Sequence, residues 1–185
     1  MQSVEETRLA ARDDLATAVL ADNRAAGRRI AVAESCTGGM VSAALTDIAG
    51  SSDVFSAGFV TYSGQAKQAQ LDVSSEILET FGEVSLATAW AMAAGVLANS
   101  DADVAVAITG IAGPGGGSEK KPVGQVVFAR ALRGQDPDDY FTQRVRFEST
   151  DRRAIRHHAT LFALELLQPG KDSLRPSEDV TLPAP

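Results

Sequence analysis

The six residues 34–39, Glu-Ser-Cys-Thr-Gly-Gly, have the composition of a turn that binds a ligand and carries a nucleophile. Ser35 stands just after the short apolar run 30–33, which we interpret as a buried strand, and just before a helical pattern. In α/β sheets, ligands bind beyond the carboxyl ends of the strands, where helix N-termini point. The threonine and glycines after Ser35 bring bare backbone N–H groups there, which can hold an oxyanion or a phosphate. A plain helix cap with a tight turn explains the same residues, so the turn alone leaves both interpretations open.

A serine nucleophile needs a base, and Lys67 is the candidate that the sequence offers. It follows the second expected strand, 54–62, so we place it at the same sheet edge as Ser35. A partly desolvated lysine has a lowered pKa and can take the proton of a serine. The usual alternative is a solvated helix lysine, and spacing alone favours it. His157 and His158 are adjacent on a helix and suit an exposed basic stretch better than a base or a metal site.

Two neighbours of Ser35 have competing interpretations. Cys36 has the chemistry of a nucleophile, but such a cysteine is more often a small buried hydrophobe, and no paired histidine is evident to activate it. Glu34 suits either the orientation of a ligand or the capping of backbone N–H groups, and the sequence does not choose between these roles.

A glycine-rich loop, 110–124, follows the expected core strand 103–109 and therefore emerges at the same ligand-binding edge. Its glycines make a backbone able to wrap an anion, and Lys120 and Lys121 add positive charge. It matches neither the P-loop nor the dinucleotide-binding fingerprint. A flexible surface loop is the alternative, but prolines stiffen both ends of the stretch, which favours a functional loop.

The remaining patterns predict a single α/β domain over residues 5–167, with helices on both faces of a mixed sheet in three α/β/α layers. Helices are expected at 5–26, 40–48, 65–71, 74–81, 85–99 and 151–167, and strands at 30–33, 54–62, 103–109, 125–132 and 140–147. Residues 168–185 are rich in proline and polar residues and are expected to form a disordered tail.

Composition narrows the class of protein. The net charge of −7 argues against a nucleic-acid partner but leaves room for a small anionic ligand. The single cysteine excludes an internal disulfide and indicates a reducing compartment. The sequence has no apolar run long enough to span a membrane and no signal-peptide pattern, so we expect a cytoplasmic protein without a membrane partner. No cluster of metal ligands is visible, and no metal or other cofactor is expected.

Three segments in this order resemble the CinA C-terminal domain family. They are 33–39 (Ala-Glu-Ser-Cys-Thr-Gly-Gly), 58–67 (Gly-Phe-Val-Thr-Tyr-Ser, then Ala-Lys), and 109–124 (Thr-Gly-Ile-Ala-Gly-Pro, then Gly-Gly-Ser and Lys-Pro-Val-Gly). The resemblance spans roughly residues 10–167. It implies an amidohydrolase that converts nicotinamide mononucleotide to nicotinate mononucleotide and ammonia, in the stand-alone form of the family. The chain departs from the family pattern at Leu86, where the family tends to have an acidic residue, and 147–151 is one residue longer than usual.

The resemblance also implies roles for individual residues. Ser35 matches the nucleophile and Lys67 its base, and Tyr62 matches a polar residue of the same pocket that can pass a proton. The residues expected to contact the nucleotide substrate are Glu34, Thr37, Gly38, Gly39, Thr109, Gly110, Gly116, Gly117, Arg152 and Arg156, the two arginines at the phosphate.

Two rival functions stay open at this point. One is a non-catalytic nucleotide-binding or regulatory module related to competence or the DNA-damage response, which would bind a ligand without turnover. The other is an amidohydrolase for a different small amide. Alanine-rich helix faces also leave a homo-oligomer open.

Overall fold

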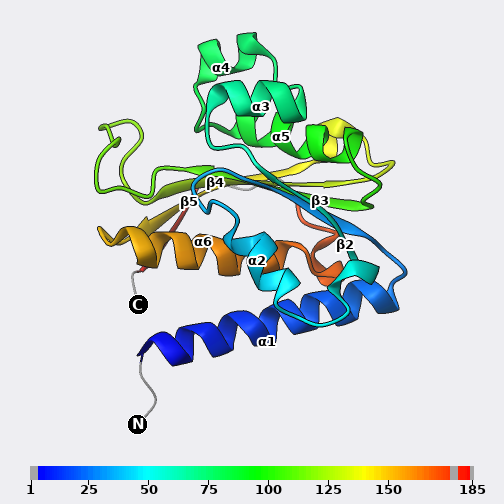
Figure 1. The fold of residues 1–185 in the computed structure, drawn as a ribbon. Coiled ribbons are helices and arrows are strands. Elements are labelled where there is room, and N and C mark those ends of the chain that lie inside the picture. The colour runs from blue at the N-terminus through cyan, green and yellow to red at the C-terminus, as the bar shows by residue number, and fades with distance from the viewer. Residues whose placement is uncertain (1–3, 176–178, 184–185) are drawn as a thin grey trace.

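A six-stranded mixed sheet forms the middle of the protein, with helices on both of its faces (Figure 1). The computed structural model describes residues 4–175 and 179–183. The strands are β1 (Ile30–Glu34), β2 (Phe55–Val60), β3 (Val104–Gly110), β4 (Gln125–Leu132), β5 (Phe141–Glu148) and β6 (Val180–Pro183). The helices are α1 (Val4–Ala25), α2 (Met40–Thr46), α3 (Gly64–Leu71), α4 (Ser75–Phe81), α5 (Leu86–Ala98) and α6 (Arg152–Leu166), with short 3-10 turns at Ser51–Asp53, Pro137–Asp139 and Pro169–Lys171.

The strand order across the sheet is β2-β1-β3-β4-β5-β6. Strand β1 is parallel to both β2 and β3, β4 is antiparallel to both of its neighbours, and β6 is parallel to β5. The carboxyl ends of β1, β2, β3, β5 and β6 therefore meet at one edge of the sheet. The predicted three-layer α/β/α class with a mixed sheet is confirmed.

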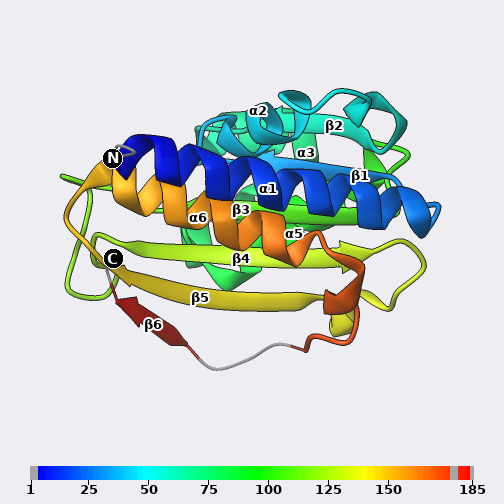
Figure 2. The same ribbon diagram turned by 90° about the horizontal axis from the view of Figure 1, so that it is seen from below.

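Two separate cores fill the space between the sheet and its helices. Helices α1, α2 and α6 cover one face, and α3, α4 and α5 cover the other (Figures 1 and 2). In β1, Val32 faces the first core and Ala33 the second. Strands buried on both faces read as continuous apolar runs in the sequence. The alanines let α5 lie close to the sheet, and Gly95 in α5 lets α3 approach so closely that a Cβ there would lie 2.1 Å from the Leu71 carbonyl oxygen.

Short polar side chains fix the starts of the helices that frame the site. The hydroxyls of Ser63, Ser74 and Ser85 accept backbone N–H groups at the starts of α3, α4 and α5, and Asp151 does so for α6. Each cap satisfies a donor that has no partner inside its helix, which fixes the residue at which the helix begins.

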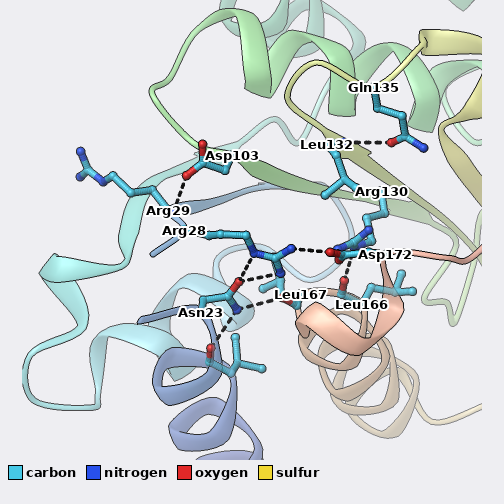
Figure 3. Close-up of polar contacts among 11 residues, drawn as sticks. Asn23, Arg28, Arg29, Asp103, Arg130, Leu132, Gln135, Leu166, Leu167 and Asp172 are labelled. Atoms are coloured by element: carbon cyan, nitrogen blue, oxygen red, sulfur yellow. Dashed lines mark hydrogen bonds and ion pairs between the residues drawn. The ribbon is translucent and has the colours of Figure 1, made fainter. Parts of the chain in front are cut away.

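The C-terminal segment differs from the expected disordered tail. Asp172 pairs with the Arg130 guanidinium and accepts from Arg28 at 2.7 Å, which anchors the chain after α6 (Figure 3). Strand β6 then pairs with β5, with Val180 opposite Val145. The polar composition concealed this order, because the segment gains its hydrogen bonds from an open sheet edge and from a buried arginine elsewhere in the chain. The parts of the predicted tail at 176–178 and 184–185 lie outside the described residues.

Candidate active site

Ser35 and Lys67 lie together at the carboxyl edge of the sheet. The Ser35 N–H donates to the Ile108 carbonyl at 2.9 Å, which continues the pairing of β1 with β3 by one residue. Helix α3 brings Lys67 to the same point, where its Nζ lies 3.2 Å from Ser35 Oγ. The Lys67 side chain is 0% exposed. The alternative of a solvated helix lysine is therefore wrong, because tertiary packing removes this lysine from water.

The surroundings of Lys67 shift its proton equilibrium in two directions. Burial lowers the pKa of Lys67 and is the larger effect, and the Glu83 carboxylate opposes it. Nζ lies 3.4 Å from Glu83 Oε2 and 3.1 Å from the Thr61 carbonyl oxygen. The Glu83 side chain is 51% exposed, so water weakens its hold on the ammonium. The net lowering of the pKa makes the neutral amine accessible as a base.

Glu34 caps helix α2, which is one of the two roles that the sequence left open. Its carboxylate accepts the backbone N–H groups of Gly39, Val41 and Ser42 at 2.8–3.1 Å, and also the Ser42 hydroxyl. The residue is 0% exposed. Several hydrogen bonds to an ionised carboxylate are strong ones, so Glu34 holds the turn at a fixed angle to α2.

The turn after Ser35 presents two backbone donors. The Gly38 N–H is already bonded to the Ser35 carbonyl, and the Gly39 N–H is bonded to Glu34. Within the described ranges, no oxygen acceptor is bonded to the N–H groups of Cys36 and Thr37. Gly39 has a φ of +95°, a conformation that glycine adopts without strain and that lets the turn run into α2. In this turn, the backbone N–H groups of Cys36 and Thr37 are therefore the ones available to donate to an oxyanion.

The side chains of the same two residues are buried. The Thr37 hydroxyl is sealed from solvent and has no hydrogen-bond partner among the described residues. Burial raises the pKa of the Cys36 thiol to about 12, outweighing the nearby Arg156 charge that lowers it. A thiol with that pKa is a poor nucleophile at neutral pH, so the hydrophobe interpretation of Cys36 holds.

Both arginines predicted for the phosphate reach the site from the start of α6, but protein oxygens already engage them. Arg156 donates to the carbonyl oxygens of Cys36 and Thr37 at 3.0 and 2.8 Å. Because the C=O and N–H of one peptide point in opposite directions, the bond to the Cys36 carbonyl turns the Thr37 N–H away from α6. Arg152 donates to the Gly113 carbonyl and, at 2.8 Å, to the hydroxyl of the exposed Tyr62.

The start of the glycine-rich loop is held by contacts with neighbouring segments of the protein. Thr109 is buried and donates to the Glu83 carbonyl at 2.8 Å. Gly110 pairs with Val126 in the sheet, and a Cβ there would lie 2.9 Å from the Gln125 carbonyl oxygen. These contacts fix Thr109 and Gly110 at the end of β3, beside Glu83 and β4. Gly116 and Gly117 lie in the exposed part of the loop.

Sequence reasoning missed Glu83 as a neighbour of Lys67. It lies between α4 and α5, after Gly82, whose φ is +79°. A signal was present in the sequence. The chain has Leu86 where the family tends to have an acidic residue, and the acidic Glu83 stands three positions earlier. Only the packing of α3 against α5 shows that this carboxylate reaches Lys67.

In residues 4–175 and 179–183, no three His, Cys, Asp or Glu side chains gather in a way that suits a metal ion. No helix in these residues is both long and apolar enough to cross a membrane.

Comparisons with known proteins agree with this arrangement of the chain. The sequence profile of the CinA C-terminal domain matches residues 12–170. Nicotinamide-nucleotide amidohydrolase PncC of Escherichia coli K12 is 50% identical over 145 residues, which are 78% of this chain and 85% of that protein. A CinA-like protein of Syntrophobacter fumaroxidans is 50% identical over 144 residues, 78% of this chain, but the match covers 33% of that longer protein. The crystal structure of competence/damage inducible protein CihA from Agrobacterium tumefaciens superposes with a TM-score of 0.81 at 46% identity, covering 85% of this chain and 93% of that one. The chain belongs to the CinA C-terminal domain family.

Proposed function

We propose that this protein is an amidohydrolase that deamidates nicotinamide mononucleotide to nicotinate mononucleotide and ammonia, with Ser35 as nucleophile and Lys67 as base. The observation that carries the proposal is the 3.2 Å approach of a fully buried lysine amine to the Ser35 hydroxyl. A nucleophile within hydrogen-bond reach of a base whose pKa is lowered is the arrangement that covalent catalysis requires. The name of the E. coli relative supports the choice of a nicotinamide nucleotide as substrate.

In the first half of the reaction, neutral Lys67 takes the Ser35 proton as Oγ attacks the carboxamide carbon. The developing oxyanion lies against the N–H groups of Cys36 and Thr37, and each well-placed donor of this kind contributes about 3 kcal/mol. When the tetrahedral intermediate collapses, the carbon–nitrogen bond breaks and protonated Lys67 passes its proton to the departing ammonia. Tyr62 is a second proton donor at the rim, because its hydroxyl accepts from Arg152 and keeps its own proton free to donate.

In the second half, water attacks the acyl-enzyme ester. Lys67, neutral again, takes a proton from that water, and Ser35 leaves as the hydroxyl while the nucleotide carboxylate departs. Glu83 and the Thr61 carbonyl hold the amine in place through both halves. The same base therefore serves acylation and deacylation, and no step needs a group that the chain lacks.

The experiment is to measure ammonia release from nicotinamide mononucleotide by the unaltered protein and by Ser35→Ala and Lys67→Ala. Both variants are expected to lose at least about 10³-fold in kcat, because residues that act as a unit fail together. Ser173→Ala and Lys171→Ala, which change the same residue types in the C-terminal segment, are the matched controls and should retain full activity. Full activity in Ser35→Ala would refute the mechanism.

A second measurement addresses the rival functions. Nicotinamide mononucleotide and free nicotinamide are compared as substrates, since binding energy from a remote phosphate raises kcat/KM for the intact nucleotide. Equal kcat/KM for both would indicate an amidohydrolase of another small amide. Saturable binding of the nucleotide with no ammonia release would indicate a non-catalytic module.

A further inference from the structure

A second polar site lies on the side of the sheet that carries Lys67, two strands away from Ser35. It is a cavity of about 300 Å³ between β4, β5, β6 and the end of the glycine-rich loop. The side chains of interest in its lining are Glu119, Lys120, Gln125, Arg144, Arg146 and Asp179. Neighbouring strands are about 4.8 Å apart, so β4 lies roughly 10 Å from β1. A larger hollow of about 520 Å³ adjoins the cavity, with Arg146 in the lining of both.

Gln125 supplies a side-chain amide to the wall of this cavity. The residue is 6% exposed and lines the cavity. Its backbone groups are bonded to Pro122 and Ile111, but its side-chain amide has no hydrogen-bond partner among the described residues. The amide atoms are not sealed from solvent, so they are open to the cavity and can donate to a ligand there.

The charges around Gln125 point to an anion. Arg146 is opposite Gln125 in the register of β4 and β5, so both side chains project from the same face. Its guanidinium is exposed and has no ion pair or hydrogen bond in the described part of the chain. Arg144 is different, because Asp179 already neutralises it at 2.6 Å. The exposed Lys120 adds a second cation, and Glu119 adds one carboxylate.

We propose that this cavity binds the phosphate group of a small phosphorylated molecule. The Arg146 guanidinium offers parallel N–H donors that match two phosphate oxygens, Lys120 supplies a point charge, and the Gln125 amide donates to a third oxygen. The volume exceeds that of a phosphate alone and leaves room for the group that carries it. The site is independent of the amidohydrolase mechanism, since it is defined by binding and includes neither Ser35 nor Lys67.

The test is a titration of inorganic phosphate into ¹⁵N-labelled protein, followed by NMR at the Gln125 side-chain amide. We expect saturable shifts of this signal. Arg146→Gln removes an exposed charge without touching the core and is expected to weaken phosphate binding at this signal at least tenfold. Arg153→Gln, which removes an exposed arginine from α6, is the matched control and should leave the affinity unchanged.

A second variant covers the interior of the site. Gln125→Glu keeps the shape of the side chain but places a carboxylate against the bound anion, so phosphate shifts at Arg146 Nε should disappear while the amide spectrum stays folded. Absence of saturable shifts in the unaltered protein, or equal affinity in Arg146→Gln, would overturn the proposal.

The source of the phosphate is decided by kinetics. If it is the substrate's own, Arg146→Gln raises KM for nicotinamide mononucleotide at least tenfold but not for nicotinamide riboside, which lacks the phosphate. If a separate phosphorylated molecule uses the site, both KM values stay unchanged while phosphate binding is lost. Failure of the deamidation itself would leave the NMR result standing, so the two proposals fail separately.

Discussion

Two buried cations lie toward opposite edges of the same sheet and do different work. Lys67 at the carboxyl edge is 0% exposed and contacts the Ser35 hydroxyl. Arg130 toward the other edge is 3% exposed, donates to the Leu166 carbonyl at 2.7 Å and pairs with Asp172 (Figure 3). A lysine can give up its proton when burial lowers its pKa, whereas an arginine stays charged in proteins. The first arrangement suits a base, and the second suits a structural anchor.

The polar groups around Arg130 and those in the turn beside Ser35 differ in how completely they are hydrogen-bonded. Around Arg130 the polar groups are paired with one another, because Asn23 donates to the Leu167 carbonyl and Arg28 bonds both Asn23 and Asp172 (Figure 3). In the turn beside Ser35, the backbone N–H groups of Cys36 and Thr37 have no oxygen acceptor among the described residues. Satisfied networks stabilise a fold, and unused donors beside a nucleophile are what a reaction can employ.

The largest expected effect comes from Lys67→Met, which keeps the volume and removes the amine. Activity should fall by about 10³-fold or more, through loss of the base. Stability should rise by about 1 kcal/mol at pH 7, because a buried ionisable group is replaced by an apolar one. The folded-state pKa of Lys67 lies below its usual value, so its cost to stability is largest at low pH and fades as pH rises toward 10.5. Urea denaturation at several pH values measures this, and a stability loss in the variant would contradict it.

Arg130→Met should behave in the opposite way. Ammonia release should stay within about twofold, while the free energy of unfolding falls by about 2 kcal/mol. Loss of one partner from a fully buried pair costs about 3–5 kcal/mol, and Asp172 is 43% exposed and keeps Arg28, which reduces the loss. Denaturation and the ammonia assay on the same preparation test both halves. An inactive but fully stable variant would contradict the assignment of Arg130 as a structural anchor.

Glu83→Gln should sharpen the description of the base. The Glu83 carboxylate raises the pKa of Lys67, so its removal lowers that pKa further. Because the neutral amine is the active form, the acid limb of the pH profile of kcat/KM should move to lower pH. An unmoved limb, or one moved to higher pH, would show that Lys67 is not the group that titrates. Glu79→Gln, which changes an exposed glutamate of α4, controls for the general loss of a negative charge.

The smallest effect is expected for Cys36→Ala. The thiol has a pKa of about 12, so its reactive thiolate is about 10⁻⁴ of the total at pH 8. The variant should keep kcat within about threefold, and mass spectrometry should find the native thiol slow to react with iodoacetamide. Rapid alkylation with loss of activity would return Cys36 to consideration as the nucleophile.

The sequence predicted most of the elements because their signals are local. The apolar run 30–33, the alanine-rich stretch 85–99 and the capping serines depend on neighbours a few residues away. The family was also accessible, since its motifs are short and ordered along the chain. The structure departs from the expectation for 168–185 because Asp172 pairs with Arg130 and β6 pairs with β5, and both partners are distant in sequence.

The sequence by itself therefore determined the layered α/β class, the position of the turn at Ser35 and the family of the chain. Only the tertiary structure decided what each polar side chain near that turn does. Lys67 contacts the Ser35 hydroxyl, and Glu83 lies beside the same amine. Glu34 accepts backbone N–H groups at the start of α2, and Arg156 donates to the turn. The physical reason is that periodicity and capping act within one segment, whereas burial and charge pairing depend on which segments meet.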